Sequence, residues 1–369
     1  MGFPVSPEDR ARARAKLAEA RRIVVKIGSK TLAGEPAVYA RLAAAVAEAR
    51  TDGREVVLVS SGAIALGVKK LGYRARPKEM AKLQAAAAAG QSVLMRLYEE
   101  AFDAHGITVA QVLLTHADLA DRTRDNNARA ALGALLEAGA TPILNENDSV
   151  SVEEIKFGDN DQLASMVVPL IDADLLVLLS DVSGLMTLEG ERIPLVVDVA
   201  SEALPHVRAG ASAVGTGGMA SKVEAARRAT LAGADVVVAD ARAPEALRGV
   251  LRGEDYGTLF VRSGEPLGAR RHWIAFTLRP RGTLIVDAGA AIALRERGKS
   301  LLAVGVLGVR GHFGPLDAVT IVDSDGQEIG RGLARHGTPE LARIAGRRTD
   351  EDGLAVHRDD LVVWTRGHP

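Results

Sequence analysis

Two lysines lie next to glycines at the ends of predicted secondary-structure elements, where a phosphate could bind. Lys26 lies near the end of a short apolar segment, residues 23–27, and Gly28 follows it. Lys222 comes after a glycine-rich stretch, residues 215–218, in the first turn of a predicted helix. Glycine lets backbone N–H groups approach an anion, and lysine supplies positive charge. Neither stretch has Walker A or GxGxxG spacing, so each alone is also compatible with a surface lysine or a ligand-free loop.

A serine and a glycine follow the second apolar segment. Ser61 and Gly62 come directly after residues 55–60, before a predicted helix. The free N–H groups at such a helix start can hold an anion, although Ser61 could also serve only as the helix cap. Ser180 and Asp181 follow residues 175–179 in the same way, and there a type I turn explains the pair as well as nucleotide binding does.

The densest polar cluster spans residues 145–161. Asn and Asp are common in turns, and Asp159 could simply cap the next helix. Together, however, acids and amides suit an amino-acid substrate, whose ammonium needs acceptors and whose carboxylate needs donors. A carboxylate near two lysines could also orient them or hold Mg2+. The residues concerned are Asn145, Asp148, Asp159, Asn160 and Asp161.

Short β-branched or leucine-rich segments alternate with long alanine-rich stretches over the first two thirds of the chain. This alternation is typical of βαβ units and predicts an α/β fold with a buried, mostly parallel sheet. The predicted strands are residues 23–27, 55–60, 108–114, 141–145, 175–180 and 236–239. The predicted helices are residues 36–52, 77–104, 124–138, 159–171 and 219–232. Because parallel strands place their carboxyl ends at one edge, the polar residues that follow them are expected to converge.

The composition changes near residue 255, where glycine and proline become frequent and helices scarce. Short alternating segments from residue 280 onward, at 283–287, 302–304, 319–322 and 361–364, predict a small β-rich barrel with one or two helices. We therefore expect four parts: an N-terminal surface helix at 1–21, a large domain at 22–258, a linker at 259–279 and a small domain at 280–369.

Charge and cysteine content limit the possible partners. The chain has 46 Lys and Arg against 47 Asp and Glu, a formal net charge of -1, so no overall field draws it to nucleic acid or to an anionic membrane. It has no cysteine, which excludes disulfides, thiolate metal sites and cysteine nucleophiles and is compatible with a reducing compartment. The N-terminal stretch has no long apolar segment, and the cytoplasm is the expected location.

Taken in order, the segments VVKIGSK, SSGAIALG, LLTHADL, PILNENDSV, EIKFGDNDQLA, LLSDVSGLM and GTGGMASK resemble the glutamate 5-kinases of the amino-acid kinase superfamily. The tail resembles the PUA domain of that family, and the resemblance covers nearly the whole chain after Arg21. It implies a three-layer α/β sandwich with a mostly parallel central sheet, plus a small β-rich PUA-like barrel. It also implies ATP-dependent phosphorylation of the γ-carboxylate of L-glutamate to L-glutamyl 5-phosphate, the first step of proline biosynthesis, with Mg2+.

The resemblance also implies roles for individual residues. Lys26 and Lys222 would lie on either side of the triphosphate, and Asp161 would organise them and the metal. Ser61, Asp148 and Asn160 match glutamate-binding positions, with Asn145 and Asp159 nearby. The ATP-binding segments correspond to Lys26, Ser180, Asp181, Thr216, Gly217, Gly218, Met219, Ala220, Ser221 and Lys222.

Two stretches depart from the family pattern, residues 186–198 beside the expected adenine contacts and residues 349–355. Acetylglutamate kinase, aspartokinase and carbamate kinase are similar in general architecture but lack the appended PUA-like domain. That domain also raises the alternative of an RNA-binding protein, although acidic and basic residues in the tail are nearly balanced and an oligomerisation or regulatory role is the preferred interpretation. The resemblance further implies proline as a feedback inhibitor, a homodimer or homotetramer, and association with glutamate-5-semialdehyde dehydrogenase.

Overall fold

The computed structural model describes residues 6–34, 37–150, 160–207, 218–347 and 353–364. The chain separates into two compact units, Met1–Pro266 and Leu267–Pro369. Among the described residues, unit 1 has one sheet and two hydrophobic cores, and unit 2 has two sheets and one core. In the described part, no helix combines the length and the apolar character needed to cross a membrane.

Unit 1 is built around an eight-stranded sheet in the order β3-β4-β2-β1-β5-β7-β8-β6. The first six strands in this order pair in parallel, whereas β8 runs antiparallel to β7 and pairs in parallel with β6. The strands are β1 Arg22–Ile27, β2 Glu55–Ser60, β3 Val109–Leu114, β4 Thr141–Glu146, β5 Leu175–Ser180, β6 Leu195–Val196, β7 Asp235–Asp240 and β8 Thr258–Phe260.

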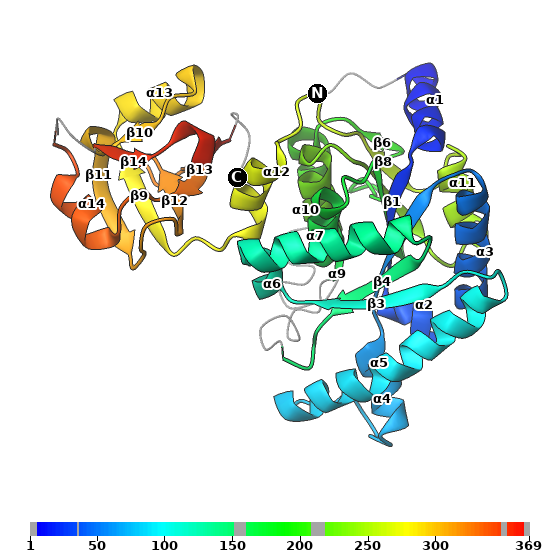
Figure 1. The fold of residues 1–369 in the computed structure, drawn as a ribbon. Helices are drawn as coiled ribbons and strands as arrows, with labels where there is room; N and C mark the ends of the chain where they lie inside the picture. The colour runs from blue at the N-terminus through cyan, green and yellow to red at the C-terminus, as the bar shows by residue number, and fades with distance from the viewer. Residues whose placement is uncertain (1–5, 35–36, 151–159, 208–217, 348–352, 365–369) are drawn as a thin grey trace. The chain divides into compact units, whose positions relative to one another are not determined.

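Helices cover both faces of this sheet (Figure 1). In β1, Ile23, Val25 and Ile27 point into one core, with side chains from α3, α5 and α11, while Val24 points into the other, with α7, α9 and α10. The helices of unit 1 are α1 Pro7–Ala15, α2 Ser29–Gly34, α3 Ala37–Thr51, α4 Ala63–Lys70, α5 Met80–Asp103, α6 His116–Ala120, α7 Arg122–Glu137, α9 Asn160–Leu170, α10 Met219–Leu231 and α11 Ala246–Leu251, with short turns at Lys16–Glu19, Val199–Ala203 and Leu204–His206. The predicted three-layer α/β fold is confirmed.

All six strands predicted for this unit are present, within one or two residues of their predicted ends. β6 and β8 were not predicted, because segments of two and three residues carry no readable alternation. The helix predicted at 77–104 begins only at Met80. The start of the helix predicted at 159–171 lies outside the described residues, and its described part runs to Leu170.

Helices α4 and α5 touch backbone to backbone through two glycines. A Cβ on Gly67 would lie 1.7 Å from the carbonyl oxygen of Ala86, and one on Gly90 would lie 1.7 Å from that of Ala63. Any side chain at either position would therefore push the helices apart. This contact fixes α5 against the start of α4, which directly follows β2.

Unit 2 contains a five-stranded sheet, in the order β11-β9-β12-β13-β15, and a separate β10-β14 pair. Its core contains Leu284, Val286, Val319, Ile321 and Ile329. The strands are β9 Gly282–Val286, β10 Leu301–Leu302, β11 Val306–Gly311, β12 Ala318–Val322, β13 Glu328–Leu333, β14 Leu354–Val356 and β15 Leu361–Val363. The helices are α12 Ala269–His272, α13 Ala288–Arg297 and α14 Thr338–Ile344, with turns at Trp273–Thr277, Ala303–Gly305 and Arg358–Asp360.

The predicted β-rich small unit is confirmed. The strand predicted at 302–304 is wrong in part, because only Leu301–Leu302 is extended and Ala303–Gly305 forms a 3-10 turn. β13 was missed because glycines interrupt its pattern. Gly330 is required there, since a Cβ would lie 2.0 Å from the carbonyl oxygen of Val362 on β15.

Candidate active site

Three segments distant in sequence meet at the carboxyl ends of the central strands. Lys26 is the penultimate residue of β1 and lies between Val59 of β2 and Leu178 of β5. Asp161 lies in the first turn of α9, and Lys222 in the first turn of α10. All three side chains are buried. The sheet therefore brings together residues that are nearly 200 positions apart in sequence.

Asp161 bridges the two lysines. Its Oδ1 lies 2.6 Å from Lys26 Nζ, and its Oδ2 lies 3.0 Å from Lys222 Nζ and 3.4 Å from Ser221 Oγ. Burial raises the pKa of Asp161, but Lys26 and Lys222 outweigh it and hold the pKa below its ordinary value. The carboxylate is therefore ionised at neutral pH.

Counted over these three side chains alone, the bridge carries a formal charge of +1, because two ammonium groups face one carboxylate. Buried net charge is costly unless an opposite charge accompanies it. A site at the carboxyl ends of parallel strands with an excess of positive charge is suited to an anion such as a phosphate chain. Among the sequence-predicted residues, Lys26, Asp161 and Lys222 are brought together as expected.

A chain of amides lies beside the bridge. Asn160, the residue before Asp161, donates from Nδ2 to Ser60 O at 2.6 Å, Ser61 Oγ at 2.9 Å and Asn145 Oδ1 at 3.0 Å. Asn145 donates in turn from Nδ2 to Gln91 Oε1 at 2.9 Å. The predicted residues Ser61, Asn145 and Asn160 therefore form one network. Gln91 was not predicted, although a glutamine within the alanine-rich stretch that forms α5 was a visible signal.

Asp148 and Asp159 complete the predicted amino-acid pocket. Asp148 lies partly buried in the turn that follows β4, three residues after Asn145. Asp159 lies outside the described residues. The end of β4 therefore lies close to the amide network, whereas residues 151–159, which precede α9, lie outside the described residues.

The predicted nucleotide segments follow β5 and precede α10. Ser180 is buried at the end of β5, and its Oγ lies 3.2 Å from Asp181 Oδ1. Asp181 also forms an ion pair with Lys30 at 3.0 Å, and this interaction lowers its pKa. Lys30 was not predicted, although it stands four residues after Lys26.

The glycine-rich loop is described only at its end. Gly218 is the N-cap of α10, and Met219, Ala220 and Ser221 form its first turn with Lys222. Thr216 and Gly217 lie outside the described residues. Gly218 has no side chain with which to cap the first N–H groups of this 13-residue helix.

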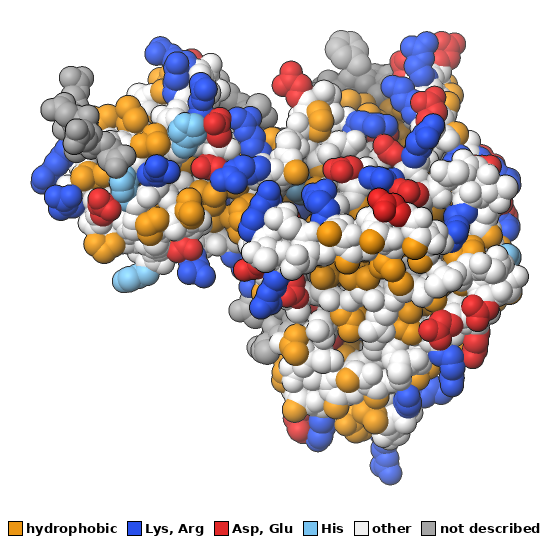
Figure 2. Space-filling model, in the orientation of Figure 1, with side chains coloured by type: hydrophobic (Ala, Val, Ile, Leu, Met, Phe, Trp, Pro, Cys, Tyr) orange, Lys and Arg blue, Asp and Glu red, His pale blue; other side chains and the backbone are white. Residues whose placement is uncertain are grey.

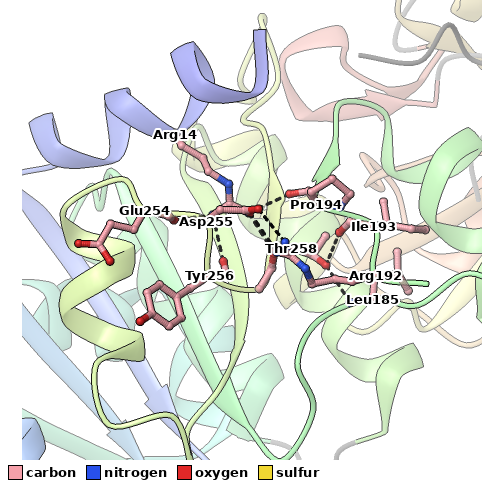
Figure 3. Close-up of polar contacts among 10 residues, drawn as sticks. Arg14, Leu185, Arg192, Ile193, Pro194, Glu254, Asp255, Tyr256 and Thr258 are labelled. Carbon is pink, nitrogen blue, oxygen red and sulfur yellow. Dashed lines mark hydrogen bonds and ion pairs between the residues drawn. The ribbon is translucent and has the colours of Figure 1, made fainter. Parts of the chain in front are cut away.

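The hairpin after β5 is held by the N-terminal helix (Figure 3). Arg14 of α1, predicted to belong to a surface helix, is in fact 4% exposed and reaches inward. Its guanidinium donates to the carbonyl oxygens of Glu254, Tyr256, Pro194 and Gly257, and it pairs with Asp255 at 2.9 Å.

The same cluster fixes the hairpin from its other side. Arg192 pairs with Asp255 at 2.7 Å, and Thr258 Oγ1 accepts from the amide of Leu185 and donates to the carbonyl of Ile193. Residues 186–194, the first part of the stretch that departs from the family pattern, therefore have a defined structure, which Arg14 contacts at Pro194.

The described residues contain no group of three or more His, Cys, Asp or Glu side chains that could hold a metal ion. Both oxygens of Asp161 already face lysines. Within the described residues, the donor set does not fit a metal held by side chains alone.

The sequence of this chain matches two protein-family models. The chain matches the model of the amino acid kinase family over residues 21–240 and that of the PUA domain over residues 282–351. These matches define its class, an amino acid kinase with an appended PUA domain, and they confirm the predicted phosphotransferase.

Individual relatives give the finer family. The chain is 49% identical over 370 residues to the glutamate 5-kinase of Myxococcus xanthus, covering 95% of this chain and 98% of that one. It is 46% identical over 371 residues to the glutamate 5-kinase of an Azoarcus species, covering 95% and 100%, and 44% identical over 367 residues to that of Citrifermentans bemidjiense, covering 94% and 98%. The chain belongs to the glutamate 5-kinase family, as the resemblance of its ordered motifs predicted.

Proposed function

We propose that the bridge of Lys26, Asp161 and Lys222 transfers the γ-phosphoryl group of ATP to the γ-carboxylate of L-glutamate. The product is L-glutamyl 5-phosphate, and the reaction is the first step of proline biosynthesis. The observation that carries the proposal is the pair of buried ammonium groups held by one carboxylate. The names of the relatives supply the substrate.

In this reaction an oxygen of the glutamate γ-carboxylate forms a bond to Pγ of ATP. The bond between Pγ and the β,γ-bridging oxygen breaks, which releases ADP. A carboxylate is already ionised at neutral pH, so the reaction needs no general base. A loose phosphoryl-transfer transition state mainly needs positioning and positive charge. Lys26 and Lys222 supply that charge, and Asp161 keeps both in place.

The remaining residues divide between the two substrates. We assign Ser61, Asn145, Asp148, Asp159 and Asn160 to glutamate. We assign Ser180, Asp181 and residues 216–222 to ATP, together with Lys26. Mg2+ enters as part of the substrate MgATP, held by the phosphate oxygens, because the described side chains do not form a metal cage.

Replacing Lys222 by alanine tests the assignment. We expect Lys222→Ala to lower kcat by at least about 100- to 1000-fold, because one of two charges on the transition state is lost. Turnover is measured with ATP, Mg2+ and glutamate, with hydroxylamine trapping the acyl phosphate. The control is Lys69→Ala, which changes an exposed lysine.

Both variants should unfold at the wild-type temperature, because Asp161 keeps Lys26 as its partner in Lys222→Ala. Near-normal kcat in a folded Lys222→Ala protein would contradict the proposal. A wild-type protein with no glutamate-dependent acyl phosphate would contradict the substrate.

Unit 2 contains a pocket of about 710 Å³ between α13 and residues 299–305, with Lys299 and Arg358 among its lining residues. We propose that this unit serves oligomerisation or regulation. We also propose that the protein is a homodimer or homotetramer in the cytoplasm, that proline inhibits it, and that it associates with glutamate-5-semialdehyde dehydrogenase. We further propose that the amino acid kinase domain spans residues 22–258 and the PUA-like domain residues 280–369. Salt-sensitive RNA binding by the full chain at low ionic strength would favour the RNA alternative instead.

A further inference from the structure

One amide group at the edge of the glutamate pocket has no partner. Gln91 lies in the middle of α5 and is 8% exposed. Its Nε2 is buried and makes no hydrogen bond within the part of the chain that the structure describes. A buried donor left without an acceptor costs about 1–3 kcal/mol, so an unused amide beside a binding site points to a ligand.

The orientation of this amide follows from backbone groups whose identity is certain. Asn160 lies against the carbonyl oxygen of Ser60, which only accepts, so Asn160 must present Nδ2 there. Asn145 receives the backbone N–H of Glu146 at 2.9 Å, so it must present Oδ1 there. Its Nδ2 therefore faces Gln91 and donates a hydrogen bond, which Gln91 must accept with Oε1. Both N–H groups of Gln91 are left as donors.

The position of Gln91 selects the end of the substrate. Gln91 bonds to Asn145 on β4, whereas Lys26 is on β1, and β2 lies between these strands. Two strand spacings amount to about 9–10 Å. The γ-carboxylate must lie at the lysine bridge, so the groups beside Gln91 meet the other end of glutamate. That end carries a carboxylate, which needs donors, and an ammonium, which needs acceptors.

We propose that Gln91 Nε2 donates to the α-carboxylate of bound glutamate and so selects substrates that carry this group. The proposal rests on the glutamate kinase function argued above. Ser61, whose Oγ accepts from Asn160, is locked in the same network and lies between Gln91 and the bridge. Gly90 fixes the height of Gln91, because α5 touches α4 at that residue.

The test uses Gln91→Glu, which keeps an oxygen for Asn145 Nδ2 and removes both N–H donors. We expect KM for glutamate to rise about 10- to 100-fold, the loss of a hydrogen bond to a charged group, while KM for ATP stays unchanged. The matched ligand is 4-aminobutyrate, which is glutamate without its α-carboxylate. Its inhibition constant against glutamate should not rise in the variant, because 4-aminobutyrate has no α-carboxylate to lose a donor.

A merely structural role for Gln91 predicts a different result. It would weaken glutamate and 4-aminobutyrate alike, and that outcome would overturn the proposal, as would an unchanged KM for glutamate. If Gln91→Glu does not fold, Gln91→Met, which adds no charge, must show the same selective loss. Loss of turnover in Lys222→Ala but no selective effect at Gln91 would remove this inference and leave the proposed function standing.

Discussion

At the scale of single residues, the protein places polar groups with partners next to polar groups without them. Tyr39 and Tyr98 pack edge to face, with ring centroids 5.0 Å apart, beneath the carboxyl end of β2. The hydroxyl of Tyr98 lies 3.0 Å from Ser60 Oγ, whereas that of Tyr39 is buried with no partner among the described residues. Burial raises the pKa of both phenols, that of Tyr39 to about 12.

This difference predicts opposite responses to the same substitution. Tyr98→Phe should lower the free energy of unfolding by about 1 kcal/mol, because the buried hydrogen bond between Tyr98 and Ser60 is lost and Ser60 Oγ keeps only its bond to Ser61 O. Tyr39→Phe should leave the free energy of unfolding unchanged or raise it, because it removes an unsatisfied buried hydroxyl. Urea unfolding at pH 7 measures both. Equal destabilisation by the two variants would contradict the pairing seen here.

The same tyrosines predict a loss of stability at high pH. Above pH 10 an exposed phenol in the unfolded chain loses its proton, while the folded chain holds the proton of Tyr39 up to a pKa of about 12. The unfolded state is therefore favoured increasingly as pH rises through this window. Tyr39→Phe should reduce that decline, and unfolding curves at pH 9, 10 and 11 would show it; an unchanged decline would assign it to other groups.

At the scale of elements, helix contacts decide where the substrate groups stand. α4 begins beside Ser61 and α5 carries Gln91, and the two helices meet at Gly67 and Gly90. The proposed glutamate pocket is therefore shaped by a contact that involves none of the proposed glutamate-binding residues. Arg14 acts similarly near the β8 edge of the sheet, where it holds Pro194 at the end of the hairpin and pairs with Asp255.

Alanine substitutions can test the role of the α4–α5 contact. Gly90→Ala places a Cβ 1.7 Å from the carbonyl oxygen of Ala63, and we expect it to lower the free energy of unfolding by at least about 1–3 kcal/mol and to raise KM for glutamate. Gly133→Ala in α7 is the control, because its Cβ meets nothing within 4 Å. It should stabilise by up to about 1 kcal/mol and leave KM unchanged. Similar behaviour of the two variants would contradict the close contact.

At the scale of the whole molecule, the proposed chemistry belongs to one unit. Lys26, Asp161, Lys222 and Gln91 all lie in Met1–Pro266, which has its own two cores. Basic and acidic side chains are interspersed on the face of unit 1 seen in Figure 2, as the formal net charge of -1 leads one to expect. Nothing in the charge of that face marks it as a nucleic-acid surface.

A shortened chain tests this separation. We expect residues 1–266 to fold and to form acyl phosphate from glutamate and ATP, because every proposed catalytic group and its partners remain. Circular dichroism, sedimentation and the hydroxylamine assay would be compared with the full chain. A folded but inactive 1–266 protein would show that unit 2 contributes to the site, and a change of subunit number alone would support its role in oligomerisation.

The sequence by itself determined the six parallel strands of the large sheet, the main helices and the family, because buried parallel strands are continuous apolar runs and the motifs keep their order. It also singled out Lys26, Asp161, Lys222, Ser61, Asn145 and Asn160 as candidate site residues, since polar residues near the ends of apolar strands and the starts of helices stand out. Only the tertiary structure decided which of these touch and what completes them. Gln91, Lys30 and Arg14 act through partners up to about 240 positions away, and contacts between separate elements are absent from any local pattern of residues.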